Sequence, residues 1–199
     1  MKISIISASH RKNSQSRRIS KIIKDYILKK NNSLDFFSLD MFESNIPLWT
    51  SEKKENSKFW NKEIKLISSE LASSDGFIFV VPEYGGMATP NSKNFFLVFN
   101  NGELFHKPGL IVSISSGNGG AYPISELRSS SYKNSHIMWI PENIIIRNVE
   151  QFSPGNHGEL IPKWIDDRIR YTCNLLINYA DYLKPIQKLI NRKDFANGM

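Results

Sequence analysis

The chain has 199 residues, an apolar fraction of 40% and a formal net charge of +7, which predicts one domain whose core needs neither a disulfide nor a structural metal. Its single cysteine, Cys173, excludes an intramolecular disulfide and suits the reducing cytoplasm. No apolar run reaches the roughly 20 residues that a membrane helix requires, and the short apolar run at residues 3–7 is not a signal peptide, so neither membrane insertion nor secretion is expected.

Apolar runs typical of strands alternate with amphipathic helical patterns along the whole chain. Residues 76–81 (GFIFVV) form a continuous apolar run, as expected for a central parallel strand that is buried on both faces. The patterns predict, in chain order, strand 2–7, a helix around 19–27, strand 34–39, a polar loop within 41–57, helix 60–71, strand 76–81, helix 91–99, strand 108–115, helix 124–132, strand 137–140, a separate extended segment at 144–146 and a long helix over 161–183.

Strands that alternate with helices predict an α/β fold with a parallel sheet. We expect a flavodoxin-like three-layer sandwich, with a five-stranded parallel sheet in the order 2-1-3-4-5 and helices on both faces. The ligand site of such a sheet lies outside the carboxyl ends of its strands. We assign residues 1–184 to this domain and residues 185–199 to a polar C-terminal tail.

Much of the positive charge lies in two stretches, the first of them near the start of the chain. Most of these side chains are interpreted as solvated surface charge, and the remainder would suit a ligand that carries phosphate. No aromatic residues are interleaved with them, so a nucleic-acid partner is not expected. The two stretches contain Arg11, Lys12, Arg17, Arg18 and Lys21, and then Lys53, Lys54 and Lys58.

The loop that follows the first strand, residues 7–16, has the composition of an anion site. Ser9, Ser14 and Ser16 can donate hydroxyl hydrogen bonds, and Arg11 can add a positive charge. The loop leads into a helix, whose N-terminal amides favour an anion. The alternative is that Ser14 or Ser16 only caps this helix. The spacing is that of neither a P-loop nor a GxGxxG turn.

Two further loops follow the third and fourth strands, and both combine glycines with a tyrosine. Adjacent glycines let the backbone approach a flat ligand closely, and a tyrosine ring offers a surface for stacking. The alternative is an ordinary turn with Tyr84 covering the core. The candidate residues in the two loops are Pro82, Glu83, Tyr84, Gly85 and Gly86, and then Ser115, Ser116, Gly117 and Gly120.

These loops resemble those of the NADPH-dependent FMN reductase family, which includes quinone, chromate and azo-dye reductases. Residues 8–14 match its GSxRxxS-type phosphate loop, and residues 82–86 match its PEYN(G) loop, with the expected Lys93-Asn94 pair following. Lys107-Pro108, the next strand and its glycine-rich loop are also similar, as is the stretch 40–49. The resemblance spans residues 2–146. The chain departs from it at Ala8, where glycine is usual, and at Gly85, where asparagine is common.

The resemblance implies an oxidoreductase that uses FMN and NADPH. Ser9, Arg11, Ser14 and Ser16 would hold the FMN phosphate, and residues 82–86 and 115–120 would flank the isoalloxazine. Hydride would pass from the nicotinamide to flavin N5 and on to a quinone, a flavin or another small acceptor, with no catalytic side chain needed. A homodimer or homotetramer in the cytoplasm is expected. The alternatives are an FMN-binding electron carrier and a non-catalytic flavin-binding module.

The remaining reactive residue types are interpreted as structural. His10, His106, His136 and His157 show no metal-ligand spacing, so no metal site is expected. Cys173 lies in an apolar helical pattern and is interpreted as a packing residue. The aromatic residues Phe95, Phe96, Phe99, Trp139 and Trp164 are assigned to the core or to a subunit interface.

Overall fold

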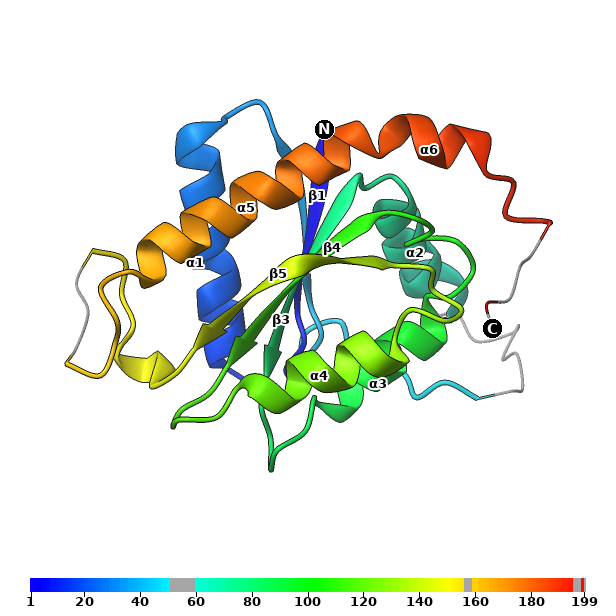
Figure 1. Cartoon of the computed structure of the whole chain (residues 1–199). Coiled ribbons are helices and arrows are strands. Elements are labelled where there is room, and N and C mark those ends of the chain that lie inside the picture. The colour runs from blue at the N-terminus through cyan, green and yellow to red at the C-terminus, as the bar shows by residue number, and fades with distance from the viewer. Residues whose placement is uncertain (51–59, 156–158, 195–197, 199) are drawn as a thin grey trace.

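A computed structural model of the chain describes residues 1–50, 60–155, 159–194 and 198, and Figure 1 shows its arrangement. The five strands form one parallel sheet in the order β2-β1-β3-β4-β5. This confirms the predicted flavodoxin-like α/β fold. The elements are β1 (Lys2–Ser7), α1 (Gln15–Lys30), β2 (Asp35–Asp40), η1 (Trp60–Ile64), α2 (Lys65–Ala72), β3 (Gly76–Pro82), α3 (Pro90–Val98), β4 (Pro108–Ile114), α4 (Ala121–Ser130), β5 (Met138–Ile146), η2 (Val149–Gln151), α5 (Ile165–Tyr182) and α6 (Lys184–Leu189).

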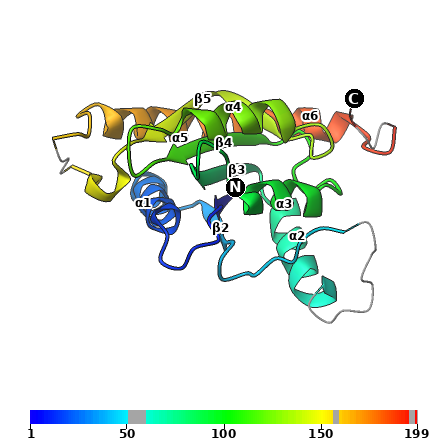
Figure 2. The same cartoon turned by 90° about the horizontal axis from the view of Figure 1, so that it is seen from below.

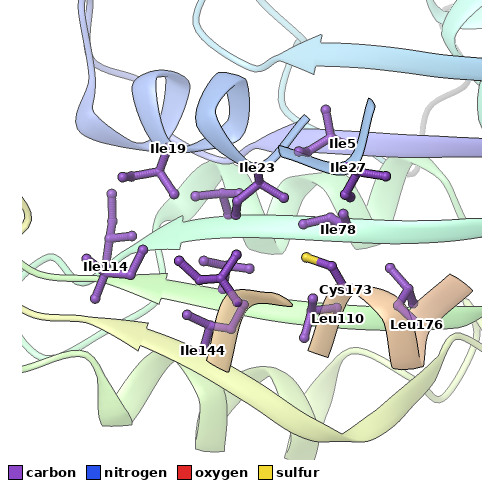
Figure 3. Packing of buried hydrophobic residues seen from close by; sticks show 14 of the residues in the cluster. Ile5, Ile19, Ile23, Ile27, Ile78, Leu110, Ile114, Ile144, Cys173 and Leu176 are labelled. Carbon is purple, nitrogen blue, oxygen red and sulfur yellow. The ribbon is translucent and has the colours of Figure 1, made fainter. Parts of the chain in front are cut away.

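Helices cover both faces of the sheet and create two apolar cores. Helices α1 and α5 pack on one face, where isoleucines of α1 point at β1 and β3 (Figure 3), and α2, α3 and α4 cover the other face (Figure 2). Every residue of β3 and β4 is buried. The continuous apolar runs of these two strands are therefore explained by burial on both faces.

The register of the sheet brings the ends of the central strands to one edge. Ser7 of β1 lies beside Val80 of β3, and Pro82 of β3 lies beside Ile114 of β4. The loops that begin at residues 8, 83 and 115 therefore leave the sheet at neighbouring points. This arrangement is the structural basis of the site described below.

The predicted separation of the fifth strand from the segment 144–146 is wrong. Both belong to β5, which pairs with β4 across a bulge. Gly109 lies opposite Trp139, but Ile111 lies opposite Asn143, so β5 contributes extra residues between these pairs. Pro141 falls in this bulge, where its missing N–H interrupts no regular ladder. The expected strand 137–140 ends directly before this proline.

The helix predicted over residues 60–71 begins with a π-helical turn, η1, before it continues as α2. The last long helix, α5, ends before Pro185 as expected, although it begins only at Ile165. The segment expected as a polar tail contains α6, and the Gln187 and Arg192 side chains donate to main-chain carbonyls of His106 and Asn100. Residues 51–57 of the predicted loop, Lys53, Lys54, Lys58 and His157 lie outside the described residues.

Of the residues interpreted as packing elements, Cys173 and the three phenylalanines are buried, Trp139 is partly buried and Trp164 is exposed. The Phe95 ring contacts those of Phe96 and Phe99, and Phe96 contacts Trp139, whereas Trp164 is 60% exposed. Cys173 projects from α5 into the core (Figure 3), and burial raises the pKa of its thiol to about 12. Within the described ranges, no helix combines the length and the apolarity needed to span a bilayer.

Candidate functional site

A cleft of about 200 Å³ lies at the carboxyl edge of the sheet. It is formed where the turns after β1, β3, β4 and β5 meet, and Figure 1 shows the turns after β3 and β4 projecting from this edge. The lining residues are Arg11, Lys12, Asn13, Ser14, Gln15, Ser16, Pro82, Glu83, Tyr84, Ile114, Ser115, Ser116, Val149 and Glu150.

The first wall of the cleft is the β1–α1 loop, in which a chain of hydroxyl groups leads to the helix. Ser16 Oγ lies 3.0 Å from both Ser7 Oγ and Ser14 Oγ. Ser14 accepts a hydrogen bond from the Arg17 amide at 3.3 Å and is the N-cap of α1. The capping role and the ligand role are compatible, because the cap uses one lone pair of a hydroxyl that still lines the cleft.

Tyr84 crosses from the second loop to the first. Its hydroxyl lies 2.8 Å from Ser9 Oγ, and its ring packs edge-on against His10 at 5.4 Å. The Arg11 guanidinium lies 5.7 Å from the centre of the same ring, within cation–π range. Ser9 is fully buried and also accepts from the Arg11 amide at 3.1 Å. Ser9 therefore fastens the loop from beneath and does not line the cleft.

The second loop makes a tight turn that depends on its glycines. Gly85 and Gly86 have φ values of +58° and +77°, a region that glycine adopts without strain. Tyr84 and Met87 exchange two main-chain hydrogen bonds across this turn, at 3.0 and 3.1 Å. The turn is also fastened to α4, because Glu126 accepts from the Ala88 amide at 2.6 Å. These bonds give the turn a defined shape before any ligand enters.

The third loop runs from β4 to the first turn of α4. The Gly117 amide donates to Ser115 Oγ at 3.2 Å, and Gly120 begins the helix with a φ of +105°. From the side of β5, Arg147 Nε donates to the carbonyls of Asn118 and Gly119, at 2.7 and 3.1 Å. Glu83 accepts from the Gly120 amide at 2.6 Å and so joins the second loop to the third.

The Lys93-Asn94 pair, which carried part of the resemblance, supports the site from α3. Lys93 Nζ lies 2.8 Å from Glu126, the carboxylate that holds the second loop. Asn94 donates to the Pro47 carbonyl at 2.9 Å and accepts from the Trp49 amide at 2.7 Å. Asn94 therefore fixes the loop after β2 against α3, which explains why the asparagine and the proline stretch occur together.

The structure brings most of the sequence-predicted residues to the cleft and adds six. Arg11, Ser14, Ser16, Pro82, Glu83, Tyr84, Ser115 and Ser116 line it, whereas Ser9, Gly85, Gly86, Gly117 and Gly120 shape the loops around it. The six added residues are Lys12, Asn13, Gln15, Ile114, Val149 and Glu150. The first three lie within the predicted first loop, and Ile114 ends β4. Val149 and Glu150 follow β5. Reading residues 138–146 as one strand beside β4 would have placed them at the same edge of the sheet as the other loops.

The charges around the cleft are mixed, with the cations on the first loop. Arg11 and Lys12 lie on the β1–α1 side, and Glu83 and Glu150 lie across from them. Arg18 donates to the carbonyls of Val149 and Phe152 and thereby holds the β5 side against α1. Partial burial lowers the pKa of Arg18 from its ordinary value, although the negative charge of Glu150 opposes this effect.

The hydrogen-bond donors and cations that line the cleft fit a phosphate group, and the glycine-containing loops next to them fit a flat ring. The first loop offers hydroxyls, two cations and the N-terminus of α1, which together favour an anion. A volume of about 200 Å³ is below the range of roughly 300–1,000 Å³ of complete ligand pockets. It would enclose the phosphate end of FMN and leave the ring toward the glycine turns. Among the described residues, no three His, Cys, Asp or Glu side chains are grouped to hold a metal ion.

Comparison of the sequence with known families gives one match over most of the chain. The family described as NADPH-dependent FMN reductase matches residues 1–151, which include β1 to β5 and every residue that lines the cleft. No curated protein matches the sequence.

Solved structures show the same fold at low sequence identity. An oxidoreductase from Corynebacterium diphtheriae superposes with a TM-score of 0.72 at 17% identity, over 91% of this chain and 97% of its own. FerB from Paracoccus denitrificans, a flavoenzyme NAD(P)H:(acceptor) oxidoreductase, gives 0.70 at 16% identity, over 91% and 97%. An apo NADH:FMN oxidoreductase, EmoB, gives 0.66 at 14% identity, over 90% and 88%.

Proposed function

The chain belongs to the NADPH-dependent FMN reductase family, and we propose that it passes hydride from NAD(P)H through FMN to a quinone, a flavin or another small acceptor. It is an oxidoreductase whose cofactors are FMN and NADPH. The observation that carries the proposal is that the β1–α1 loop, with its hydroxyls and cations, meets the first residues of the two glycine-containing loops in one cleft. A phosphorylated planar cofactor needs both features at neighbouring points.

Each wall of the cleft has a separate task in this proposal. Arg11, Ser14, Ser16 and the first amides of α1 would hold the phosphate by charge-assisted hydrogen bonds. Pro82–Gly86 and Ser115–Gly120 would flank the isoalloxazine, and those main-chain N–H groups of the two loops that have no internal acceptor would stabilise negative charge on it. When bound, FMN supplies hydride acceptance at its N5 position, so the protein needs no general base.

The first experiment asks whether the purified protein carries flavin and accepts hydride. We expect a yellow protein, or a colourless one that takes up added FMN, and we expect NADPH to bleach it in the absence of oxygen. A protein that takes up no FMN would contradict the proposal. Bleaching by dithionite but not by NADPH or NADH would instead support an electron carrier.

The phosphate assignment is tested by the double variant Arg11→Ala/Ser14→Ala. Loss of charge-assisted hydrogen bonds should weaken FMN binding by about 2–4 kcal/mol, measured by quenching of flavin fluorescence. Arg170→Ala/Ser129→Ala removes the same side-chain types from exposed positions of α5 and α4 and serves as the control. Unchanged binding in the first variant would show that the phosphate lies elsewhere.

The active unit proposed here is a homodimer or homotetramer in the cytoplasm. Met87 and Tyr122 are 58% and 68% exposed beside the glycine turns, and large exposed apolar side chains near a site favour an interface there. The lone, buried Cys173 suits a reducing compartment. Light scattering during size-exclusion chromatography gives the oligomeric state, and a monomeric active enzyme would contradict this part of the proposal.

A further inference from the structure

The Glu83 side chain occupies an unusual position for a carboxylate in a cofactor cleft. It lines the cleft, but its Oε2 atom accepts the Gly120 amide proton at 2.6 Å. Gly120 begins α4, where free N–H groups and the helix dipole favour an anion. Glu83 thus supplies an internal anion to a helix terminus that faces the proposed ring site.

The third loop is shaped around this carboxylate. A Cβ atom at Gly119 would lie 2.3 Å from Glu83 Oε1, so a side chain at position 119 would displace the carboxylate. On its other side the loop is held by Arg147, whose Nε donates to the Gly119 carbonyl at 3.1 Å. The loop therefore lies between Glu83 and Arg147, and its glycine provides the space that Glu83 needs.

The hydrogen bond of Glu83 joins the second and third loops, each of which also makes contacts of its own with other parts of the protein. The second loop is fastened to the first by the contact of Tyr84 with Ser9, and to α4 by the bond from the Ala88 amide to Glu126. The Glu83–Gly120 hydrogen bond sets the spacing between the second and third loops. These are the two loops between which a planar ring would have to fit.

We propose that Glu83 is a positioning residue that fixes the spacing of the two glycine loops before the cofactor arrives, and that its charge lowers the reduction potential of the bound flavin. The proposal rests on the proposed function. A loop that is already ordered loses less conformational freedom when a ligand binds, so affinity increases. A negative charge beside a ring that gains negative charge on reduction opposes that reduction.

Three substitutions separate the spacing role from the charge role. Glu83→Gln keeps an oxygen acceptor for the Gly120 amide but removes the charge, so FMN affinity should stay within about threefold and the midpoint potential should rise. Glu83→Asp keeps the charge, but its side chain is one methylene shorter and does not reach Gly120. Affinity should fall by about tenfold while the potential stays near that of the wild type.

Glu83→Ala removes both features and should show the affinity loss together with the higher potential. Glu70→Gln is the matched control, because Glu70 pairs with Lys2 at the opposite end of the sheet. Equal FMN affinity in Glu83→Ala and the wild type, or an unchanged potential in Glu83→Gln, would overturn the proposal. Equal thermal stability of the variants keeps the comparison free of folding effects.

A measurement on the cofactor-free protein tests the bridge without relying on the proposed function. Hydrogen exchange of the peptide that contains Gly120 should be slow in the wild type and in Glu83→Gln, and faster in Glu83→Asp and Glu83→Ala. Equal exchange in all four proteins would overturn the positioning role. If the wild type takes up no FMN, the proposed function fails, and the exchange result still decides whether Glu83 holds the two loops together.

Discussion

Gly120→Ala should be the most damaging single-methyl addition in the third loop. Gly120 has a φ of +105°, and an added Cβ would lie 2.6 Å from Ile145 Cγ2 on β5. Ordinary contacts at such a position begin near 3.4 Å, so either β5 or the first turn of α4 must move. Strand β5 is part of the sheet and α4 packs on it, so neither can shift without loosening the core.

The expected cost has two parts. A non-glycine residue at this φ costs roughly 1–3 kcal/mol, and overpacking a well-packed position costs about 1–3 kcal/mol. Because a small shift relieves both strains together, we expect a loss of about 3 kcal/mol. For a chain of this size that corresponds to a melting temperature lower by about 6–12 °C.

Gly117→Ala is the matched control within the same loop. Nothing lies within 4 Å of a Cβ at Gly117, and its φ is not in the left-handed region, so the change should stay within about 0.5 kcal/mol. Calorimetry and urea unfolding measure both variants. The double variant Gly120→Ala/Ile145→Ala, which removes the Cγ2 methyl group that the added Cβ would meet, tests whether part of the loss is recovered relative to Ile145→Ala alone. The reasoning is refuted if Gly120→Ala is as stable as Gly117→Ala.

Three further predictions concern other parts of the site and the core. Gly85→Asn should fold with little loss of stability and Gly85→Ala with more, since asparagine tolerates a φ of +58° better than alanine; comparable losses in urea unfolding would contradict this. Cys173 should not react with a thiol reagent in the native protein and should react at once on unfolding, because burial raises the pKa of its thiol to about 12; fast native-state labelling would show that the helix opens. Burial raises the pKa of Glu126, but hydrogen bonds from Lys93 and the Ala88 amide outweigh it and leave the pKa below its ordinary value. A carboxyl pKa that is lower in the folded state contributes stability above the unfolded-state pKa and loses it as the pH falls through the folded-state pKa, so Glu126→Gln should flatten the acid limb of the stability curve, and an unchanged limb would count against the Lys93 pair.

The sequence allowed the fold to be predicted because its strongest signals are local. The buried strands β3 and β4 are short continuous apolar runs. In a chain where such runs alternate with helical patterns, they are typical of buried strands and not of helices. The bulge in β5 was not predictable in this way, since Pro141 gives the same local signal inside a bulged strand as at a strand end. Val149 and Glu150 were missed for that reason, because a residue is placed at the sheet edge only when its strand is recognised.

The roles of some site residues could not be predicted because they depend on hydrogen bonds to residues far away in the sequence. Ser9 has the residue type of a phosphate ligand, yet its hydroxyl faces Tyr84, which lies 75 positions further along the chain. Glu83 was expected to flank the ring, but nothing in its neighbours indicated that its carboxylate reaches the amide of Gly120. Local sequence can therefore identify the loops of such a cleft, while the role of each side chain depends on which loop lies opposite.

The departure from the family pattern at Ala8 also has a physical explanation in the structure. Ala8 is buried, its amide donates to the Val80 carbonyl at 2.9 Å, and its own carbonyl accepts from Thr89. These bonds continue the pairing of β1 past its end, in a conformation that does not need glycine. The left-handed residue of this loop is Asn13, with a φ of +53°, directly before the helix cap. Because the turn toward the helix is made at position 13, a methyl group at position 8 adds apolar packing beneath the loop and does not disturb the residues of the proposed anion site.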